Sequence, residues 1–294
     1  MNDRSWTDFF DFATTNDLLQ RDFVQQALIA LILLGLLGGL LGPLVVSRQM
    51  AFAVHGTAEL SFTGAAAALL VGVGVNVGGV VGSIIAAVIF GLLGNRARDR
   101  DSVIGVVMAF GLGLGVLFIA LYGRPGTGFN LLAGQVVSVG TRGLTAVIVT
   151  TVIVVVVLAV IYRPLMFAST DPRVAEALGL PTRTLSVVFA VLLGASVAQC
   201  VQIIGALLVM SLIITPAAAA ARITSNPVTV VIASIVFAEI AGVGGVILSL
   251  APGLPVSVFV TTISFGIYAA CRIVGGRRQR TAGRLGATEE LTVV

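Results

Sequence analysis

The stretch ALIALILLGLLGGLLGPLVV, residues 27–46, runs from end to end without a charged side chain. An α-helix rises about 1.5 Å per residue, so about twenty apolar residues span the hydrocarbon core of a bilayer. The whole chain follows this pattern, because 57% of its 294 residues are hydrophobic and only 10% are charged. A soluble domain carries about 25% charged residues. The sequence therefore predicts an all-α polytopic membrane protein.

Apolar runs between charges and turn residues predict eight or nine membrane-spanning helices within a domain of residues 23–274. Their approximate limits are 23–46, 51–73, 77–94, 102–121, 143–162, 184–201, 203–221, 229–250 and 256–274. Almost no polar residue separates the sixth run from the seventh, so the count is eight if these two form one helix. An acidic segment, residues 1–22, precedes the domain. The polar tail 275–294 is expected to be disordered.

The positions of the arginines predict the orientation of the chain, because cytoplasmic loops are enriched in basic residues. With nine spans, the following basic groups fall on one side: Arg48, residues 95–100, Arg163, Arg173, Arg183, Arg222 and residues 277–280. We therefore expect an acidic N-terminal segment outside and a cytoplasmic C-terminus, with Arg124 and Arg142 as exceptions. The chain holds no lysine, and its formal net charge of +4 indicates membrane topology rather than affinity for nucleic acid.

The glycine-rich stretches are better explained by helix packing than by nucleotide binding. GLGLG (111–115) resembles a nucleotide loop, but a phosphate-binding P-loop needs a lysine, which this chain lacks. GLLGGLLG (35–42) contains two overlapping pairs of glycines four residues apart, which lets helix backbones approach closely in a bilayer. If ATP drives this protein, a partner subunit must therefore supply the nucleotide site.

Apart from Arg272 near the end of the last predicted span, three residues with an acidic or imidazole side chain lie inside the predicted spans, where such groups are energetically costly and are by default candidates for function. His55, the only histidine, and Glu59 lie one helical turn apart on the same face. Imidazole and carboxylate together suit zinc, manganese or ferrous iron, and a symmetric dimer would supply two of each. The alternative is that the two side chains only pair with each other and fix a helix.

The third ionisable residue, Glu239, allows two interpretations. It lines a pathway for an ion, or it bonds to a polar group of a neighbouring span. Gln199 and Gln202 are candidate polar neighbours of Glu239 and candidate residues of the same pathway.

The longest predicted cytoplasmic loop, residues 163–183, contains a short helix in the stretch DPRVAEAL. Asp171 suits the N-cap, Pro172 suits the first helical position, and Gly179 suits the C-terminal stop. The loop is either an ordinary solvated connection or a rigid helix presented to a cytoplasmic partner.

Several motifs resemble those of the zinc/manganese/iron ABC-transporter permease family, in order over residues 27–274. GPLVVSRQMAFAVHGTAELSFTG (42–64) resembles the opening signature of that family, with Gly42, Val46, Arg48 and Gly64 in register. IIGALLVMSLIITPAAAAAR (203–222) is the most specific match. Three further stretches are similar to family segments: DSVIGVVMAFGLGLGVL (101–117), DPRVAEALGLPTRTL (171–185) and GGVILSLAPGLPVSVFV (244–260).

The resemblance implies the permease subunit of an ATP-binding-cassette importer of a divalent transition metal, in the cytoplasmic membrane. It implies a homodimer, a cytoplasmic ATPase dimer that holds ATP, and an extracytoplasmic metal-binding protein. It implies no enzymatic activity and no permanently bound cofactor in this chain. The segment 171–181 would be the cytoplasmic coupling helix, with Asp171, Ala175 and Gly179 matching the family pattern.

The resemblance also implies that the metal ligands are His55 and Glu59, but in an exchanged order. In the family an aspartate comes first and a histidine follows four residues later, whereas here the histidine comes first. Gln49 stands where the family usually has a second arginine, and Glu239 matches no family residue. The alternative function is an ATP-independent cation carrier or channel that uses the three intramembrane ionisable residues.

Overall fold

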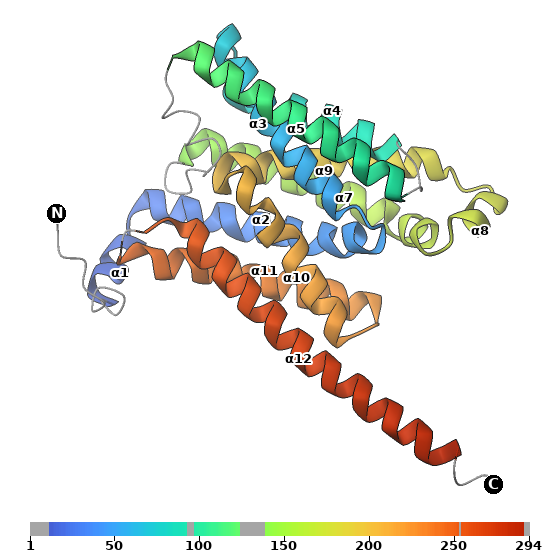
Figure 1. The fold of residues 1–294 in the computed structure, drawn as a ribbon. Coiled ribbons are helices and arrows are strands. Elements are labelled where there is room, and N and C mark those ends of the chain that lie inside the picture. Colours follow the sequence, from blue (N-terminus) through green and yellow to red (C-terminus); the bar gives the residue numbers. More distant parts are fainter. Residues whose placement is uncertain (1–11, 93–96, 124–138, 253, 291–294) are drawn as a thin grey trace.

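The computed structural model describes the backbone of residues 12–92, 97–123, 139–252 and 254–290, and all of the regular structure there is helical (Figure 1). The helices are α1 (Phe12–Leu19), α2 (Asp22–Ser47), α3 (Ala51–Val71), α4 (Val75–Leu92), α5 (Ala97–Tyr122), α7 (Gly140–Thr170), α8 (Pro172–Ala177), α9 (Thr182–Ile204), α10 (Val209–Ile223), α11 (Pro227–Leu250) and α12 (Val256–Glu290). A single 3-10 turn, Ala206–Leu208, connects α9 to α10.

Eight helices are long and apolar enough to cross a membrane, namely α2, α3, α4, α5, α7, α9, α11 and α12. The chain is therefore an all-α polytopic membrane protein, as its sequence predicted. Gly205 ends α9 with a φ of +87°, a conformation that suits glycine, and so α9 and α10 are separate helices. Helix α10 is apolar but has only 15 residues. Eight helices of spanning length agree with the predicted count of eight or nine, and the count is eight because α10 is short, not because α9 and α10 form one helix.

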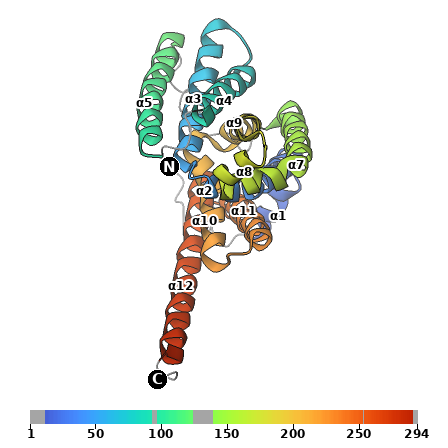
Figure 2. The ribbon, with the colours of Figure 1, turned by 90° about the vertical axis from the view of Figure 1, so that its right-hand side faces the viewer.

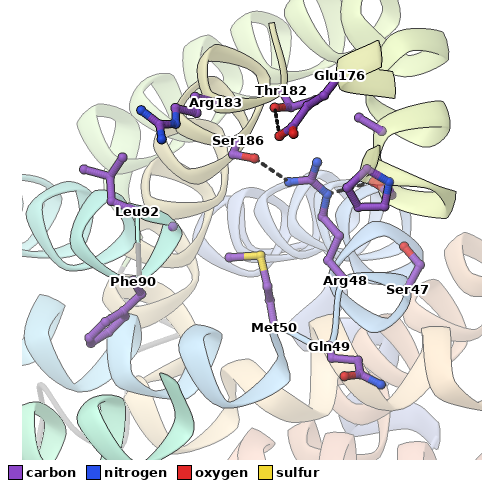
Figure 3. A pocket seen from close by; sticks show the side chains of 14 residues that line it. Ser47, Arg48, Gln49, Met50, Phe90, Leu92, Glu176, Thr182, Arg183 and Ser186 are labelled. Carbon is purple, nitrogen blue, oxygen red and sulfur yellow. Dashed lines mark hydrogen bonds between the residues drawn. The ribbon is translucent and has the colours of Figure 1, made fainter. Parts of the chain in front are cut away.

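One end of the helix bundle carries several of the arginines that the sequence placed on one side of the membrane. Arg48 directly follows α2 and bonds to Ser169 at the end of α7 and to Ser186 at the start of α9. Arg183 lines the same cavity as these residues (Figure 3). We call this end of the bundle the arginine end. Of the predicted basic loop 95–100, residues 95 and 96 lie outside the described residues.

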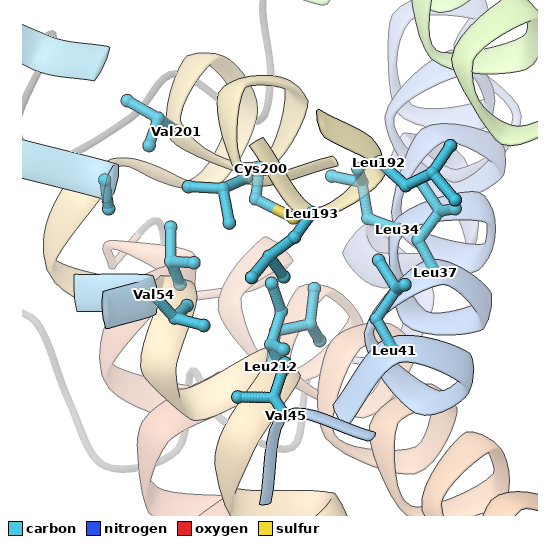
Figure 4. Packing of buried hydrophobic residues seen from close by; sticks show 14 of the residues in the cluster. Leu34, Leu37, Leu41, Val45, Val54, Leu192, Leu193, Cys200, Val201 and Leu212 are labelled. Atoms are coloured by element: carbon cyan, nitrogen blue, oxygen red, sulfur yellow. The ribbon is translucent and has the colours of Figure 1, made fainter. Parts of the chain in front are cut away.

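Helix α2 runs through the middle of the bundle, between two groups of helices. Helices α3, α4, α5 and α9 form one group, and α10, α11 and α12 form the other (Figures 1 and 2). Leu37 and Leu41 of α2 lie in the buried core with Val54 of α3, Leu193 of α9 and Leu212 of α10 (Figure 4). A helix that is apolar all round is expected in such a central position.

Glycines bring several helix backbones into direct contact, as the glycine pairs in the sequence predicted. A Cβ atom on Gly38 of α2 would lie 2.7 Å from the backbone oxygen of Leu212 on α10. A Cβ on Gly64 of α3 would collide with the backbone oxygen of Gly78 on α4. In a bilayer the hydrophobic effect does not drive helices together. Close packing of helix backbones at such small residues stabilises the bundle instead.

We predict that Gly64→Ala destabilises the protein by about 1–3 kcal/mol, because an added methyl group must push the backbones of α3 and α4 apart. Thermal unfolding of the detergent-solubilised protein, followed by size-exclusion chromatography, measures this change. Gly113→Ala in α5 is the matched control, since a Cβ there meets no atom within 4 Å. Equal melting temperatures for the two variants would contradict the packing argument.

The structure describes part of each end of the chain. Helix α12 continues through residues 275–290 of the predicted polar tail and projects beyond the other helices (Figure 1). An existing helix extends without a new nucleation step. Of the predicted acidic segment 1–22, α1 covers Phe12–Leu19, and residues 1–11 lie outside the described residues.

Candidate metal site

Helix α3 carries His55 and Glu59 one turn apart in its N-terminal half. It begins at Ala51, shortly after the arginine end, and it ends where Gly72 adopts a left-handed conformation with a φ of +79°. The pair therefore lies on the first turns of a membrane-spanning helix, close to the arginine end. Glu59 is only 4% exposed and His55 is partly buried.

Both side chains of the pair contain a buried polar atom without a hydrogen-bond partner. Among the described residues only four buried side-chain polar atoms lack a partner, and two of them are His55 Nδ1 and Glu59 Oε2. Leaving a buried polar atom unpaired costs about 1–3 kcal/mol, and more for a charged group. These two atoms form no hydrogen bond with each other. They are available to a ligand.

The other polar side chains of α3 have backbone partners. Thr57 Oγ1 donates to the backbone oxygen of Ala53 at 2.7 Å, and Ser61 Oγ donates to that of Gly79 on α4 at 3.0 Å. Thr63 Oγ1 lies 2.7 Å from the backbone oxygen of Gly111 on α5. The bonds of Ser61 and Thr63 hold α3 against α4 and α5, whereas that of Thr57 stays within α3. Among the described residues of α3, only His55 and Glu59 have a buried side-chain polar atom without a partner.

One chain supplies only part of a metal coordination shell at this position. Among the described residues no group of three or more histidine, cysteine, aspartate or glutamate side chains could hold a metal ion. Zinc sites in proteins are usually four-coordinate, and manganese favours more ligands still. A site built on His55 and Glu59 therefore needs further ligands from water, from backbone oxygens or from a second copy of the chain.

Glu239 lies away from the pair, in the other group of helices. It is half-buried on α11, and a Cβ on Gly35 of α2 would lie 2.8 Å from its Oε1. Gly35 thus makes the space that the carboxyl group of Glu239 occupies. The structure does not bring Glu239 together with His55 and Glu59 into one cluster.

The two glutamines that the sequence suggested as neighbours of Glu239 lie on α9. Gln202 Nε2 donates to the backbone oxygen of Asn76 at 3.2 Å and so ties α9 to α4. Gln199 is buried, with 6% of its surface exposed. Gln202 therefore bonds to α4 rather than to Glu239 on α11.

The short helix at the arginine end forms as the sequence predicted. Asp171 Oδ1 accepts hydrogen bonds from the backbone N–H groups of Arg173 and Val174, each at 3.1 Å, and Pro172 opens α8. Gly179 has a φ of +80°, so the chain leaves the helix through a left-handed residue.

The residues exposed around α8 are not all those that the sequence predicted to couple to an ATPase. Ala175 is completely buried, so it packs inward and cannot itself contact a partner. Val174 and Leu178 are instead 44% and 69% exposed. Leu178 follows α8 as its C-cap, and its N–H donates to the backbone oxygen of Val174, so the two side chains lie one turn apart at the end of the helix. Apolar residues with this spacing in a polar loop were the signal that would have identified them.

The chain is similar over most of its length to membrane proteins of known transport systems. A model of the ABC 3 transport family matches residues 20–274. The manganese transport system membrane protein MntC of Halalkalibacterium halodurans is 29% identical over 247 residues, which is 83% of this chain and 82% of that protein. The manganese import system permease protein ScaB of Streptococcus parasanguinis is 26% identical over 215 residues, or 73% and 75% of the two chains.

Two solved structures share the fold. A chain of PsaBC from Streptococcus pneumoniae, solved in complex with a Fab, superposes with a TM-score of 0.79 at 23% identity. The match covers 88% of this chain and 94% of that one. An inward-facing putative metal-chelate type ABC transporter gives a TM-score of 0.64 at 17% identity and covers 86% and 89%.

Proposed function

Because the chain belongs to the ABC 3 transport family, we propose that it is the permease subunit of an ATP-binding-cassette importer of a divalent transition metal. The observation that carries the proposal is the pair of buried, unpartnered atoms of His55 and Glu59 inside a membrane-spanning helix. A cation that has lost its water needs such ligands to pass through an apolar bundle. The metal is the cargo of this protein and not a resident cofactor.

Manganese is the cargo that we favour over zinc and ferrous iron. Relatives that cover most of the chain are manganese transport proteins by name. Carboxylate oxygen is a ligand that suits manganese, and imidazole is tolerated by all three metals. The exchanged order of histidine and acid retains both ligand types, so it does not argue against manganese.

The proposal includes the partners that this chain needs. The chain lacks the lysine of a P-loop, so a separate ATPase subunit would bind ATP in the cytoplasm, and the chain itself would catalyse no reaction. An extracytoplasmic metal-binding protein would deliver the ion. A homodimer would place two His55–Glu59 pairs around one path and so complete the coordination shell. The arginine end would face the cytoplasm, because basic residues favour that side.

Metal uptake into proteoliposomes tests the proposed function directly. The permease is reconstituted with its ATPase, and uptake of radioactive manganese, zinc and iron is compared with and without ATP. We expect ATP-dependent uptake that is fastest for manganese. Equal uptake without the ATPase would instead support the ion carrier or channel.

We predict that Glu239→Gln retains nearly full uptake, because Glu239 fills the space left by Gly35 and glutamine has almost the same shape. Gly35→Ala, which would place a Cβ 2.8 Å from Glu239 Oε1, should lower stability less than Gly64→Ala does, because only the end of a flexible side chain has to move. Uptake normalised to folded protein measures the first variant and thermal unfolding measures the second. A strong loss of uptake in folded Glu239→Gln protein would place this residue on the ion path.

A further inference from the structure

We propose that Arg48 is a positioning residue that links the movement of α8 to the helix that carries His55 and Glu59. The inference rests on the proposed function, since it concerns how an ATPase at the arginine end could act on the metal site. The contacts of Arg48 join two regions that are far apart in the sequence.

The guanidinium of Arg48 reaches both chain segments that flank α8 (Figure 3). Its Nε donates to Ser169 Oγ at 2.7 Å, and Ser169 lies near the end of α7, two residues before the cap of α8. Its Nη1 lies 3.5 Å from Ser186 Oγ in the first turns of α9, and its Cζ lies 5.2 Å above the ring of Phe189. One side chain therefore bridges the entry to α8 and the exit from it.

The hydroxyl of Ser169 is held in place to receive this bond. It donates its own proton to the backbone oxygen of Leu165 at 2.6 Å, which leaves a lone pair for Arg48. A displacement of the end of α7 would thus pull on the guanidinium directly. The planar fork of arginine suits such a two-sided contact better than the single ammonium of lysine.

The backbone on the other side of Arg48 forms a stiff corner. Gln49 N–H donates to the oxygen of Val46 at 3.1 Å, and Met50 N–H donates to that of Val45 at 2.9 Å, a pattern that closes the C-terminus of α2. Gln49 has a φ of +54°, and no other non-glycine residue in the described part of the chain has a positive φ. Such backbone strain persists only where the surroundings hold it. Helix α3 starts at Ala51, so no flexible loop separates this corner from the metal site.

The interactions of Arg48 are of a kind that can break and form again during a transport cycle. Among the described residues its partners are two hydroxyls and an aromatic ring, without a carboxylate. Burial lowers the pKa of Arg48, although a guanidinium stays protonated at neutral pH. A cavity of about 720 Å³ beside it, lined in part by α8, leaves room for the α7–α9 segment to shift.

The ratio of metal imported to ATP hydrolysed, measured in proteoliposomes, tests this role. We expect Arg48→Ala to bind the ATPase and to retain basal ATP hydrolysis, while metal imported per ATP falls about tenfold. Arg48→Lys should also lower the ratio, because lysine keeps the charge but loses the fork. Arg183→Ala is the matched control, since Arg183 lines the same cavity but is exposed and forms no bond in the described part of the chain. Its ratio should equal that of the wild type.

The double variant Ser169→Ala with Ser186→Ala removes the two acceptors and leaves Arg48 intact. It should lower the ratio of metal imported to ATP hydrolysed as Arg48→Ala does. If Arg48→Ala does not fold, this double variant alone tests the role of Arg48. A wild-type ratio in folded double variant or in folded Arg48→Ala would overturn the inference. Absence of ATP-dependent uptake by the wild-type complex would overturn the proposed function instead, so the two failures are distinguishable.

Discussion

Replacing His55 with alanine is expected to lower metal uptake by at least about 100-fold while the permease still inserts and folds. Loss of groups that only support a metal ligand costs about 10–100-fold, so loss of a ligand should cost at least as much. The chain has no other histidine that could take over. Glu59→Gln should have a similar effect, because it removes the charged oxygen and retains the shape. ATP-dependent uptake is measured and divided by the amount of folded protein.

Thr57→Val is the control for His55→Ala. Thr57 lies on the same buried helix, but its hydroxyl is bonded to the backbone of Ala53, so its loss should affect stability and not transport. If the His55–Glu59 pair only fixed the helix, His55→Ala would lower the melting temperature and leave uptake per folded molecule unchanged. That outcome would refute the assignment of His55 as a ligand.

Placing two glutamates on the exposed face of α8, in the variant Val174→Glu with Leu178→Glu, is expected to abolish co-purification with the ATPase. Both side chains are exposed and apolar, and buried charges without partners at an interface cost several kcal/mol. The helix itself should still form, because its cap at Asp171 and its left-handed end at Gly179 are untouched. Affinity purification through a tagged ATPase measures the loss.

Two further variants separate partner binding from folding. Val174→Leu with Leu178→Met keeps the apolar surface and should retain the complex. Ala175→Glu places a charge at a fully buried position and should reduce the amount of folded permease itself. Normal co-purification by the double glutamate variant would exclude this face of α8 as the ATPase contact.

The membrane-spanning helices could be predicted because their signal is local. An apolar run of about twenty residues has few structural solutions in a bilayer. The break between α9 and α10 could not be placed from the sequence, because it depends on one glycine, Gly205, whose backbone conformation the sequence does not show. The cap of α8 could also be predicted, since Asp171 and Pro172 act on the adjacent backbone.

The features that could not be predicted depend on contacts between distant segments. Arg48 lies 121 residues from Ser169 and 138 residues from Ser186, and nothing in the local pattern connects them. The burial of Ala175 likewise depends on the packing of α8 against α7 and α9. The spacing of His55 and Glu59 was visible in the sequence, whereas the lack of partners for their buried atoms was not.

The most direct measurement exploits the fact that His55 is the only histidine in the chain. Manganese is bound to the purified permease, prepared without a histidine tag, and electron–nuclear double resonance detects nuclei that are coupled to the metal. Permease grown with 15N-histidine should show a 15N coupling in place of the 14N coupling of unlabelled protein, and His55→Ala should show neither. Bound manganese with identical spectra from labelled and unlabelled wild-type protein would contradict the assignment of His55 as a metal ligand.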